Sequence, residues 1–238
     1  MRAFALLLLS ILSLAATPLA AQQIAYQQVI VEEVDLADQG GARFVETAAV
    51  PVPAGIAAYG PFRVLDSGRA ALVDATDERT PGHFTAMLHD YPGIATLEMV
   101  ECPGTDDDRA NLRLGLMIRA KGIATHVPDG GSVRSGAVEL FQAGARRMAE
   151  PGAEFAVHAW ADEDGREPGD YSPEAPENRA YIDYYQEMGM SPLQARSFYA
   201  MTNSVPNAEA KWLTASEMGR WVRLDRPVAA LDSAPSLP

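Results

Sequence analysis

From residue 94 to residue 160 the sequence alternates short apolar runs, rich in β-branched residues, with segments of helical spacing. Strands are predicted at Ile94–Cys102, Ile123–Val127 and Glu154–Trp160, and helices at Asp106–Ala120 and Ser135–Ala143. Because strands that alternate with helices through short connections usually lie side by side in one layer, this order indicates an α/β fold with largely parallel strands.

The pattern continues on both sides of this region. We predict a strand pair at Phe62–Val73, a helix at Pro81–Tyr91 capped by Thr80, an acidic surface loop at 161–177, and helices at Asn178–Met188, Pro192–Thr202 and after Thr214. The chain is therefore expected to form a single domain over residues 61–226. An extended N-terminal segment at 22–60 precedes it, and a flexible tail at 227–238 follows it.

The N-terminus has the plan of a secretory signal peptide. Arg2 is followed by an apolar run that ends near Ala16 and by small residues around Ala21. This run is shorter than the roughly 20 apolar residues of a transmembrane helix, which disfavours the alternative of a retained signal anchor. We expect residues 1–21 to be removed, no membrane span in the remaining chain, and a periplasmic or secreted location.

Charge and cysteine content narrow the classes of function. The chain has 32 acidic and 19 basic residues and a net charge of −13, so it repels phosphate backbones and nucleic acid is not an expected partner. Cys102 is the single cysteine, and no internal disulfide can form. Its place at the end of an apolar strand favours a small buried hydrophobe over a catalytic thiol.

No metal site and no cofactor are predicted. The candidate histidines lack ligand spacing with one another or with Cys102; they are His83, His89 and His126. The consecutive residues Asp106–Asp108 cannot all face one ion from a helix and are expected to favour the positive end of the helix dipole. The tyrosines within Tyr181–Tyr185 have helical spacing and are expected to pack.

Six short segments keep a recognisable order and spacing. They are Glu101–Thr105, Met117–Gly122, Ser135–Gly144, Phe155–Trp160, Met188–Met190 and Trp212–Glu217. From about Ser67 to Asp225 the sequence resembles the proteolytic subunit of Clp protease and the wider crotonase-like superfamily, and it is most similar to the periplasmic Clp-like proteins of bacteria.

The resemblance implies a ClpP/crotonase-like spiral of ββα units. It also implies a peptide or protein as substrate or ligand. The family often forms homo-oligomers, whereas the acidic loop at 161–177 and an altered helical arm argue against a barrel-shaped assembly here.

A site is implied as well. Ser135 corresponds to the nucleophile and His158 to the base, and the backbone amides of Gly104 and Gly136 correspond to the oxyanion hole. The residues alone leave two alternatives open: Ser135 as the N-cap of its helix, and His158 as a core histidine.

The sequence departs from the family pattern at three places. Thr105 replaces the second glycine of a Gly-Gly pair, which affects the second oxyanion donor if a glycine conformation is needed there. Ala210 falls where the acidic third member of the triad is expected, and Asp162, Asp164 and Glu209 are the other candidates. Glu139 lies in a normally apolar helix, either as a pocket acid or base or, as we favour, turned towards solvent or Arg146.

Two functions follow. The first is an extracytoplasmic, peptidase-like serine hydrolase with a Ser-His pair, weakened by up to roughly four decades in rate if no carboxylate orients the histidine. The alternative is a catalytically inactive Clp-like domain that binds a peptide or an envelope protein. An acyl-CoA enzyme is disfavoured because CoA thioesters are cytoplasmic.

Overall fold

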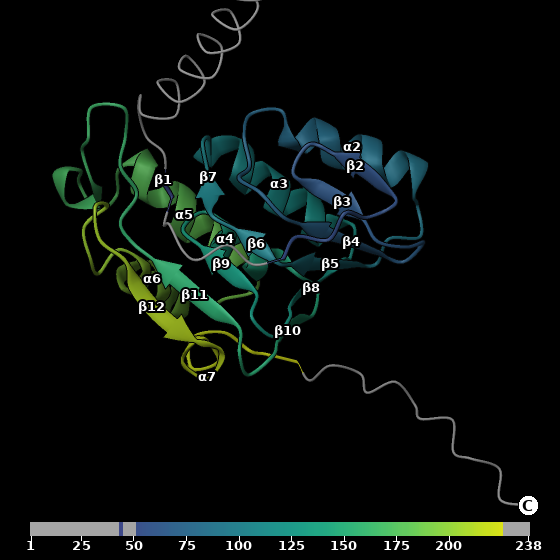
Figure 1. Ribbon diagram of the computed structural model, residues 1–238. Coiled ribbons are helices and arrows are strands. Elements are labelled where there is room, and N and C mark those ends of the chain that lie inside the picture. The colour runs from purple at the N-terminus through teal and green to yellow at the C-terminus, as the bar shows by residue number, and fades with distance from the viewer. Residues whose placement is uncertain (1–42, 45–50, 226–238) are drawn as a thin grey trace, which may run out of the picture. The chain divides into compact units, whose positions relative to one another are not determined.

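The computed structural model describes residues 43–44 and 51–225 (Figure 1). The predicted signal peptide at 1–21, most of the N-terminal segment at 22–60 and the tail at 227–238 lie outside these residues. No helix in the described ranges is long and apolar enough to cross a membrane.

Six strands form the larger sheet, in the spatial order β10-β8-β5-β4-β3-β2. They span Arg147–Ala149 (β10), Ala124–Val127 (β8), Thr96–Met99 (β5), Arg69–Leu72 (β4), Phe62–Val64 (β3) and Ala57–Tyr59 (β2). Strands β4, β5, β8 and β10 pair in parallel, whereas β2, β3 and β4 are joined antiparallel. The strand pair predicted at Phe62–Val73 is thus confirmed as the β3-β4 hairpin.

The smaller sheets carry the candidate site. A four-stranded sheet has the order β12-β11-β9-β6, with Lys211–Thr214 (β12), Glu154–Val157 (β11), Ser132–Arg134 (β9) and Glu101–Cys102 (β6). A two-stranded sheet pairs Arg43–Phe44 (β1) with Gly104–Thr105 (β7). Cys102 is fully buried, and burial raises the pKa of its thiol, so its predicted role as a small hydrophobe is confirmed.

Successive units repeat one pattern. In the pairs β5-β6, β8-β9 and β10-β11, the first strand joins the six-stranded sheet and the second joins the four-stranded sheet at the next position along it. The first two pairs are followed by the helices Asp108–Ala120 (α3) and Ala137–Ala143 (α4). This arrangement is a spiral of ββα units, so the predicted α/β fold with largely parallel strands is confirmed.

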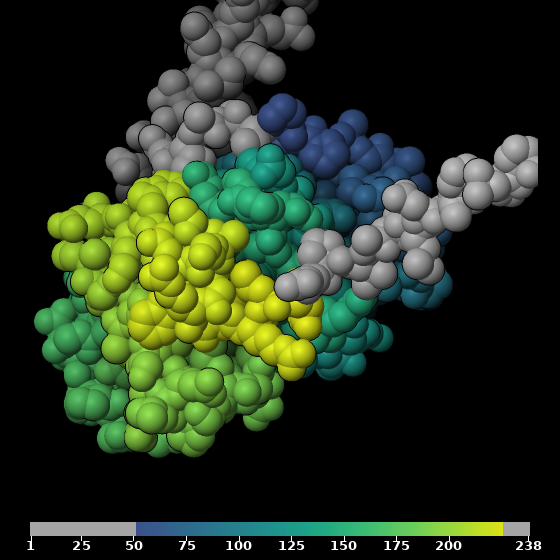
Figure 2. All heavy atoms as spheres, turned by 90° about the horizontal axis from the view of Figure 1, so that it is seen from below, coloured from purple at the N-terminus to yellow at the C-terminus, as the bar shows by residue number. Residues whose placement is uncertain are grey.

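The remaining helices are Thr80–Asp90 (α2), the short 3-10 helix Pro168–Asp170 (η1), Pro176–Glu187 (α5), Pro192–Thr202 (α6) and Ala215–Met218 (α7). The yellow C-terminal residues in Figure 2 lie directly against the green residues of α5 and α6. Phe198 of α6 contacts Trp221 there, with 6.5 Å between ring centroids. The tyrosines at 181, 184 and 185 are buried, which confirms their predicted packing role.

Local sequence signals explain where the helices begin. The Oδ1 atom of Asp107 accepts a hydrogen bond from the Ala110 amide at 2.8 Å and caps α3, as expected for an aspartate before a helix. Thr80, predicted to cap α2, is its first residue instead, and its hydroxyl bonds Asp77 at 2.8 Å. Strands β9 and β10 are only three residues each, too short for a periodicity that the sequence could show.

Candidate active site

Ser135 lies in a tight turn between β9 and α4. It has a φ of 50°, and no other non-glycine residue in the described ranges has a positive φ. This conformation costs roughly 1–2 kcal/mol for an L-residue and tends to occur at functional sites. The Ser135 amide donates to the Ala156 carbonyl at 2.8 Å, so the turn is fixed against β11.

The hydroxyl of Ser135 does not cap the helix. Gly136 is the N-cap residue of α4, and the helix begins at Ala137, two residues later than predicted. The Ser135 Oγ atom is buried and has no hydrogen-bond partner among the described residues. The capping alternative for Ser135 is therefore wrong, and its buried hydroxyl has no structural role of that kind.

Gly136 is required by the close approach of β7. A Cβ atom on Gly136 would lie 2.5 Å from Cγ2 of Thr105 and 3.2 Å from Nδ2 of Asn111. The contact with Thr105 is too short to exist and the one with Asn111 is tight, so a side chain here would force the turn and β7 apart. The structure thus brings together the two segments, Gly104–Thr105 and Gly136, that the sequence assigned to the oxyanion hole.

A buried amide holds the turn in place. The Nδ2 atom of Asn111 donates to the Gly136 carbonyl at 2.6 Å, and its Oδ1 atom accepts from the Thr76 hydroxyl at 2.9 Å. Asn111 is 1% exposed. The sequence analysis missed this residue, although Asn111 falls on the same helical stripe as the buried Leu114 and Ile118. A polar residue on an apolar stripe was the available signal.

The replacement of glycine by Thr105 leaves the strand intact. The positive φ of this segment, 141°, falls on Gly104, where the chain keeps a glycine, and Thr105 has no positive φ. The Thr105 hydroxyl lies 3.2 Å from the Thr76 carbonyl and accepts from the Asp107 amide at 3.2 Å. Threonine is therefore compatible with the backbone conformation at this position.

His158 directly follows β11, beside the serine turn. Strands β9 and β11 run parallel, with Arg134 opposite Ala156, so Ser135 and His158 lie at the carboxyl ends of neighbouring strands. The strand that precedes His158 therefore runs beside the serine turn, as the resemblance implied, but the Ser135 hydroxyl makes no hydrogen bond to the histidine. His158 is 1% exposed, and its Nδ1 atom is 2.9 Å from the Ala159 carbonyl. An Nδ1–H group donating to this carbonyl leaves Nε2 as the basic nitrogen.

The side chain beside Nδ1 of His158 is Asn207. Its Nδ2 atom lies 3.3 Å from Nδ1 and donates to the Ala159 carbonyl at 2.9 Å. The Asn207 amide donates to Oε1 of Glu167 at 2.8 Å, which fixes this loop to the acidic segment. Asn207 therefore lies beside the histidine, whereas the resemblance implied an acidic residue at position 210.

The carboxylates proposed for this role have other partners or positions. Asp162 accepts hydrogen bonds from Arg166 and Tyr171, and Asp164 pairs with Arg166 at 2.8 Å. Glu209 is exposed. Asn207 was not predicted from the sequence, because it lies in a loop three residues before position 210 and no motif marks it.

Glu139 is buried, contrary to our favoured prediction. It is 1% exposed, so it faces neither solvent nor the exposed Arg146. Its Oε1 atom accepts a hydrogen bond from the Tyr185 hydroxyl at 2.6 Å, and its backbone carbonyl accepts one from Tyr184 at 2.6 Å. Glu139 therefore joins α4 to α5 in the core. Two adjacent tyrosines supply the donors that make this burial possible.

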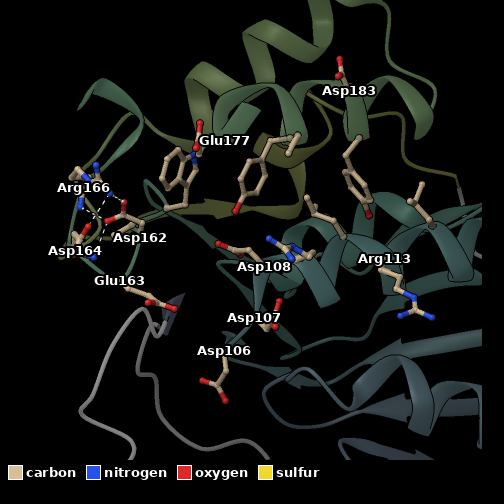
Figure 3. A pocket seen from close by; sticks show the side chains of 18 of the residues that line it. Asp106, Asp107, Asp108, Arg113, Asp162, Glu163, Asp164, Arg166, Glu177 and Asp183 are labelled. Atoms are coloured by element: carbon tan, nitrogen blue, oxygen red, sulfur yellow. Dashed lines mark hydrogen bonds and ion pairs between the residues drawn. The ribbon is translucent and has the colours of Figure 1, made fainter. Parts of the chain in front are cut away.

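An acidic groove of about 1050 Å³ begins two residues beyond His158 (Figure 3). Its charged lining is mainly acidic, with the carboxylates of Asp106, Asp107, Asp108, Asp162, Glu163, Asp164, Glu177, Asp183 and Glu187 against the guanidinium groups of Arg109, Arg113 and Arg166. Burial and the neighbouring Asp77 and Asp74 raise the pKa of Asp106. Trp160 and Tyr181 line the same groove and stack at 6.3 Å. Ser135 and His158 do not line it.

No protein-family model and no curated protein match this chain. Solved structures do match. An asparagine-to-aspartate mutant of ClpP1 from Listeria monocytogenes is 16% identical with a TM-score of 0.48, over 67% of this chain and 90% of that one. The ClpP protease catalytic domain from Plasmodium falciparum is 13% identical with a TM-score of 0.45, over 70% and 88%.

A third similar structure is a serine-to-alanine mutant of the 1510-N membrane-bound stomatin-specific protease. It is 15% identical with a TM-score of 0.44, over 66% of this chain and 76% of that one.

Proposed function

We propose that this chain is an extracytoplasmic serine hydrolase of the peptidase type, in which Ser135 is the nucleophile and His158 the general base. The observation that carries the proposal is the backbone of Ser135. A buried serine held at a φ of 50°, at the end of a strand and next to the strand that carries His158, is a costly arrangement that no structural role of its hydroxyl explains.

In the first step the Oγ atom of Ser135 attacks the carbonyl carbon of a peptide bond. The Oγ–C bond forms while the hydroxyl proton moves to Nε2 of His158, whose Nδ1–H faces the Ala159 carbonyl. Negative charge develops on the carbonyl oxygen. The Gly136 amide, which as an N-cap group has no partner within α4, would be one donor to it, and the Gly104–Thr105 strand would supply the second.

In the second step the C–N bond breaks, and the leaving amine takes the proton from His158 Nε2. Water then attacks the acyl-enzyme with His158 again as base, which releases the carboxylic acid and restores the serine. Each step uses only the serine, the histidine and backbone amides.

The rate is expected to be below that of a Ser-His-Asp enzyme. Asn207 is neutral and donates to the same Ala159 carbonyl as Nδ1–H, so it does not supply the charge stabilisation that a carboxylate gives to the imidazolium. Export is part of the proposal and is motivated by residues 1–21. Retention of the protein in the cytoplasmic fraction of cells that express the full chain would argue against this location.

Labelling by a fluorophosphonate probe tests the proposed chemistry. The purified mature protein is expected to label, and the variants Ser135→Ala and His158→Ala are expected to lose the label. Ser191→Ala is the matched control, because Ser191 is an exposed N-cap of α6 and its loss should leave labelling unchanged.

If the folded wild-type protein does not label under conditions in which the site is accessible, the serine is not activated. The chain would then be better described as a non-catalytic Clp-like domain that binds a peptide or an envelope protein. Labelling that persists in Ser135→Ala would place the nucleophile elsewhere.

A further inference from the structure

The candidate site is closed in this structure. Ser135 is 2% exposed and His158 is 1% exposed, and the Ser135 Oγ atom is itself buried. A peptide bond must come within about 3–3.5 Å of the attacking oxygen to react. Part of the chain must therefore move before a substrate reaches the serine.

Strand β1 lies where an approaching peptide would pair. Arg43 is opposite Thr105 and Phe44 is opposite Gly104, in an antiparallel register. Thr105 in turn packs on Gly136, the residue after the nucleophile. Strand β1 is thus paired with the strand proposed to carry an oxyanion donor.

The two edges of β7 have different partners. On one edge, the Gly104 carbonyl accepts from the Thr76 amide at 3.1 Å, and the Asp106 amide donates to the Thr76 carbonyl at 2.8 Å. Because successive residues of a strand direct their N–H and C=O groups to opposite sides, the Thr105 amide and carbonyl face the other edge. This is the edge that Arg43 occupies, and it is the edge that remains for an added strand.

Resting on the proposed hydrolase function, we propose that β1 is an autoinhibitory segment. Its backbone occupies the antiparallel strand position at β7 that an extended peptide substrate takes, so substrate and β1 compete for one edge. An extended peptide binds such an edge through main-chain hydrogen bonds, and the chain's own Arg43–Phe44 segment uses the same bonds.

The segment is suited to displacement. In the described residues, strand β1 has two residues and pairs with β7, whose other edge is bridged by Thr76. A pairing of two residues makes few hydrogen bonds, and short two-stranded pairings are at best marginally stable in water. A substrate that pairs over more residues, or a partner that binds the N-terminal segment, would therefore open the site at small cost.

The test uses the whole mature chain with a single backbone change. Arg43→Pro removes the amide that faces Thr105, whereas the matched control Arg43→Ala removes the side chain and keeps this amide. Fluorophosphonate labelling of Ser135 is expected to be about tenfold faster or more in Arg43→Pro than in either wild type or Arg43→Ala, since a lost pairing of about 1.4 kcal/mol corresponds to a factor of ten.

Addition of the segment in trans completes the experiment. A synthetic peptide with the sequence of residues 38–50 is expected to slow the labelling of Arg43→Pro, and the same peptide with proline in place of Arg43 is expected to have no effect. Equal labelling rates for wild type and Arg43→Pro would overturn the autoinhibition and leave the hydrolase proposal standing.

Absence of labelling in every variant would reject the hydrolase, and the autoinhibition is then decided by peptide binding. A fluorescein-labelled peptide of residues 38–50, followed by anisotropy, should bind Arg43→Pro more tightly than wild type. Equal binding of the peptide to the two proteins, or no binding to either, would show that this segment does not occupy the edge of β7.

Discussion

The carboxamide nitrogen of Asn207 lies 3.3 Å from Nδ1 of His158, and both atoms share one acceptor, the Ala159 carbonyl. The distance from each nitrogen to this carbonyl oxygen is 2.9 Å. The Nδ1–H group thus donates to the Ala159 carbonyl, and Asn207, itself a donor here, acts on the imidazole through this shared acceptor. Orientation is preserved there, but the charge that stabilises an imidazolium in a Ser-His-Asp triad is replaced by an amide.

Asn207→Asp is expected to shift the pH dependence of the site. A carboxylate beside Nδ1 favours the protonated imidazole and raises its pKa by on the order of one unit or more. Because only neutral His158 accepts the serine proton, the acid limb of the labelling rate should move to higher pH by the same amount. The plateau rate should rise, since the carboxylate also stabilises the imidazolium that forms during attack. Labelling rates measured from about pH 5 to pH 9 check both effects.

Asn207→Ala separates orientation from charge. It should lower the plateau rate without moving the acid limb upwards, because it removes the contact and adds no charge. An acid limb that is the same in Asn207→Asp and wild type would show that position 207 does not act on the base.

The sequence predicted the layers of the fold because the pattern that specifies them is local. Strand and helix periodicities are visible within a few residues. So are Asp107, which caps the start of α3, and Gly122, which follows its end. The nearness of Ser135 and His158 was also predictable, because parallel strands in a spiral of ββα units bring their carboxyl ends together.

The polar contacts around the site were less accessible to prediction. Asn111 and Asn207 act on Gly136 and His158 across 25 and 49 residues of sequence. Neither contact has a periodicity or a turn signature. Glu139 was predicted to be exposed because buried glutamates are rare, and that rule fails where the fold supplies donors, here from Tyr185 at 2.6 Å.

Gly136→Ala is expected to destabilise the protein and suppress labelling. The new Cβ would meet Cγ2 of Thr105 at 2.5 Å, and overpacking of this kind costs about 1–3 kcal/mol. Thr105→Ser removes Cγ2 and keeps the hydroxyl that bonds the Asp107 amide, so it should restore part of the loss in the double variant. Urea unfolding and labelling rates measure both. A double variant no more stable than Gly136→Ala would refute this steric account.

Tyr185→Phe is expected to lower the free energy of unfolding by about 1–3 kcal/mol, because it withdraws a hydrogen bond from a buried carboxylate. The acceptor is Oε1 of Glu139, 2.6 Å from the tyrosine oxygen. A double-mutant cycle with Glu139→Gln isolates the pair. The double variant should lose less free energy of unfolding than the two single variants lose in sum. Strictly additive losses in urea unfolding would mean that the two side chains are not energetically coupled.

His126 is expected to make stability depend on pH. Its Nδ1 atom is 2.5 Å from Oε2 of Glu98 and its Nε2 atom is 3.2 Å from Oε1 of Glu150, while Arg69 lies 3.7 Å from the other Glu98 oxygen. The hydrogen bond to Glu98 is the main cause that raises the pKa of His126 above its ordinary value, against an opposing effect of burial.

A pKa that is higher in the folded than in the unfolded state stabilises the fold below the unfolded value of about 6.5, and this contribution is lost as pH rises through the folded value. His126→Gln keeps hydrogen-bonding groups at this position but carries no charge. The difference in the free energy of unfolding between wild type and His126→Gln should therefore be larger at about pH 5.5 than at about pH 9. Chemical denaturation at both pH values measures it. A difference that is constant with pH, or that grows towards pH 9, would show that protonated His126 does not stabilise the fold through its contacts with Glu98 and Glu150.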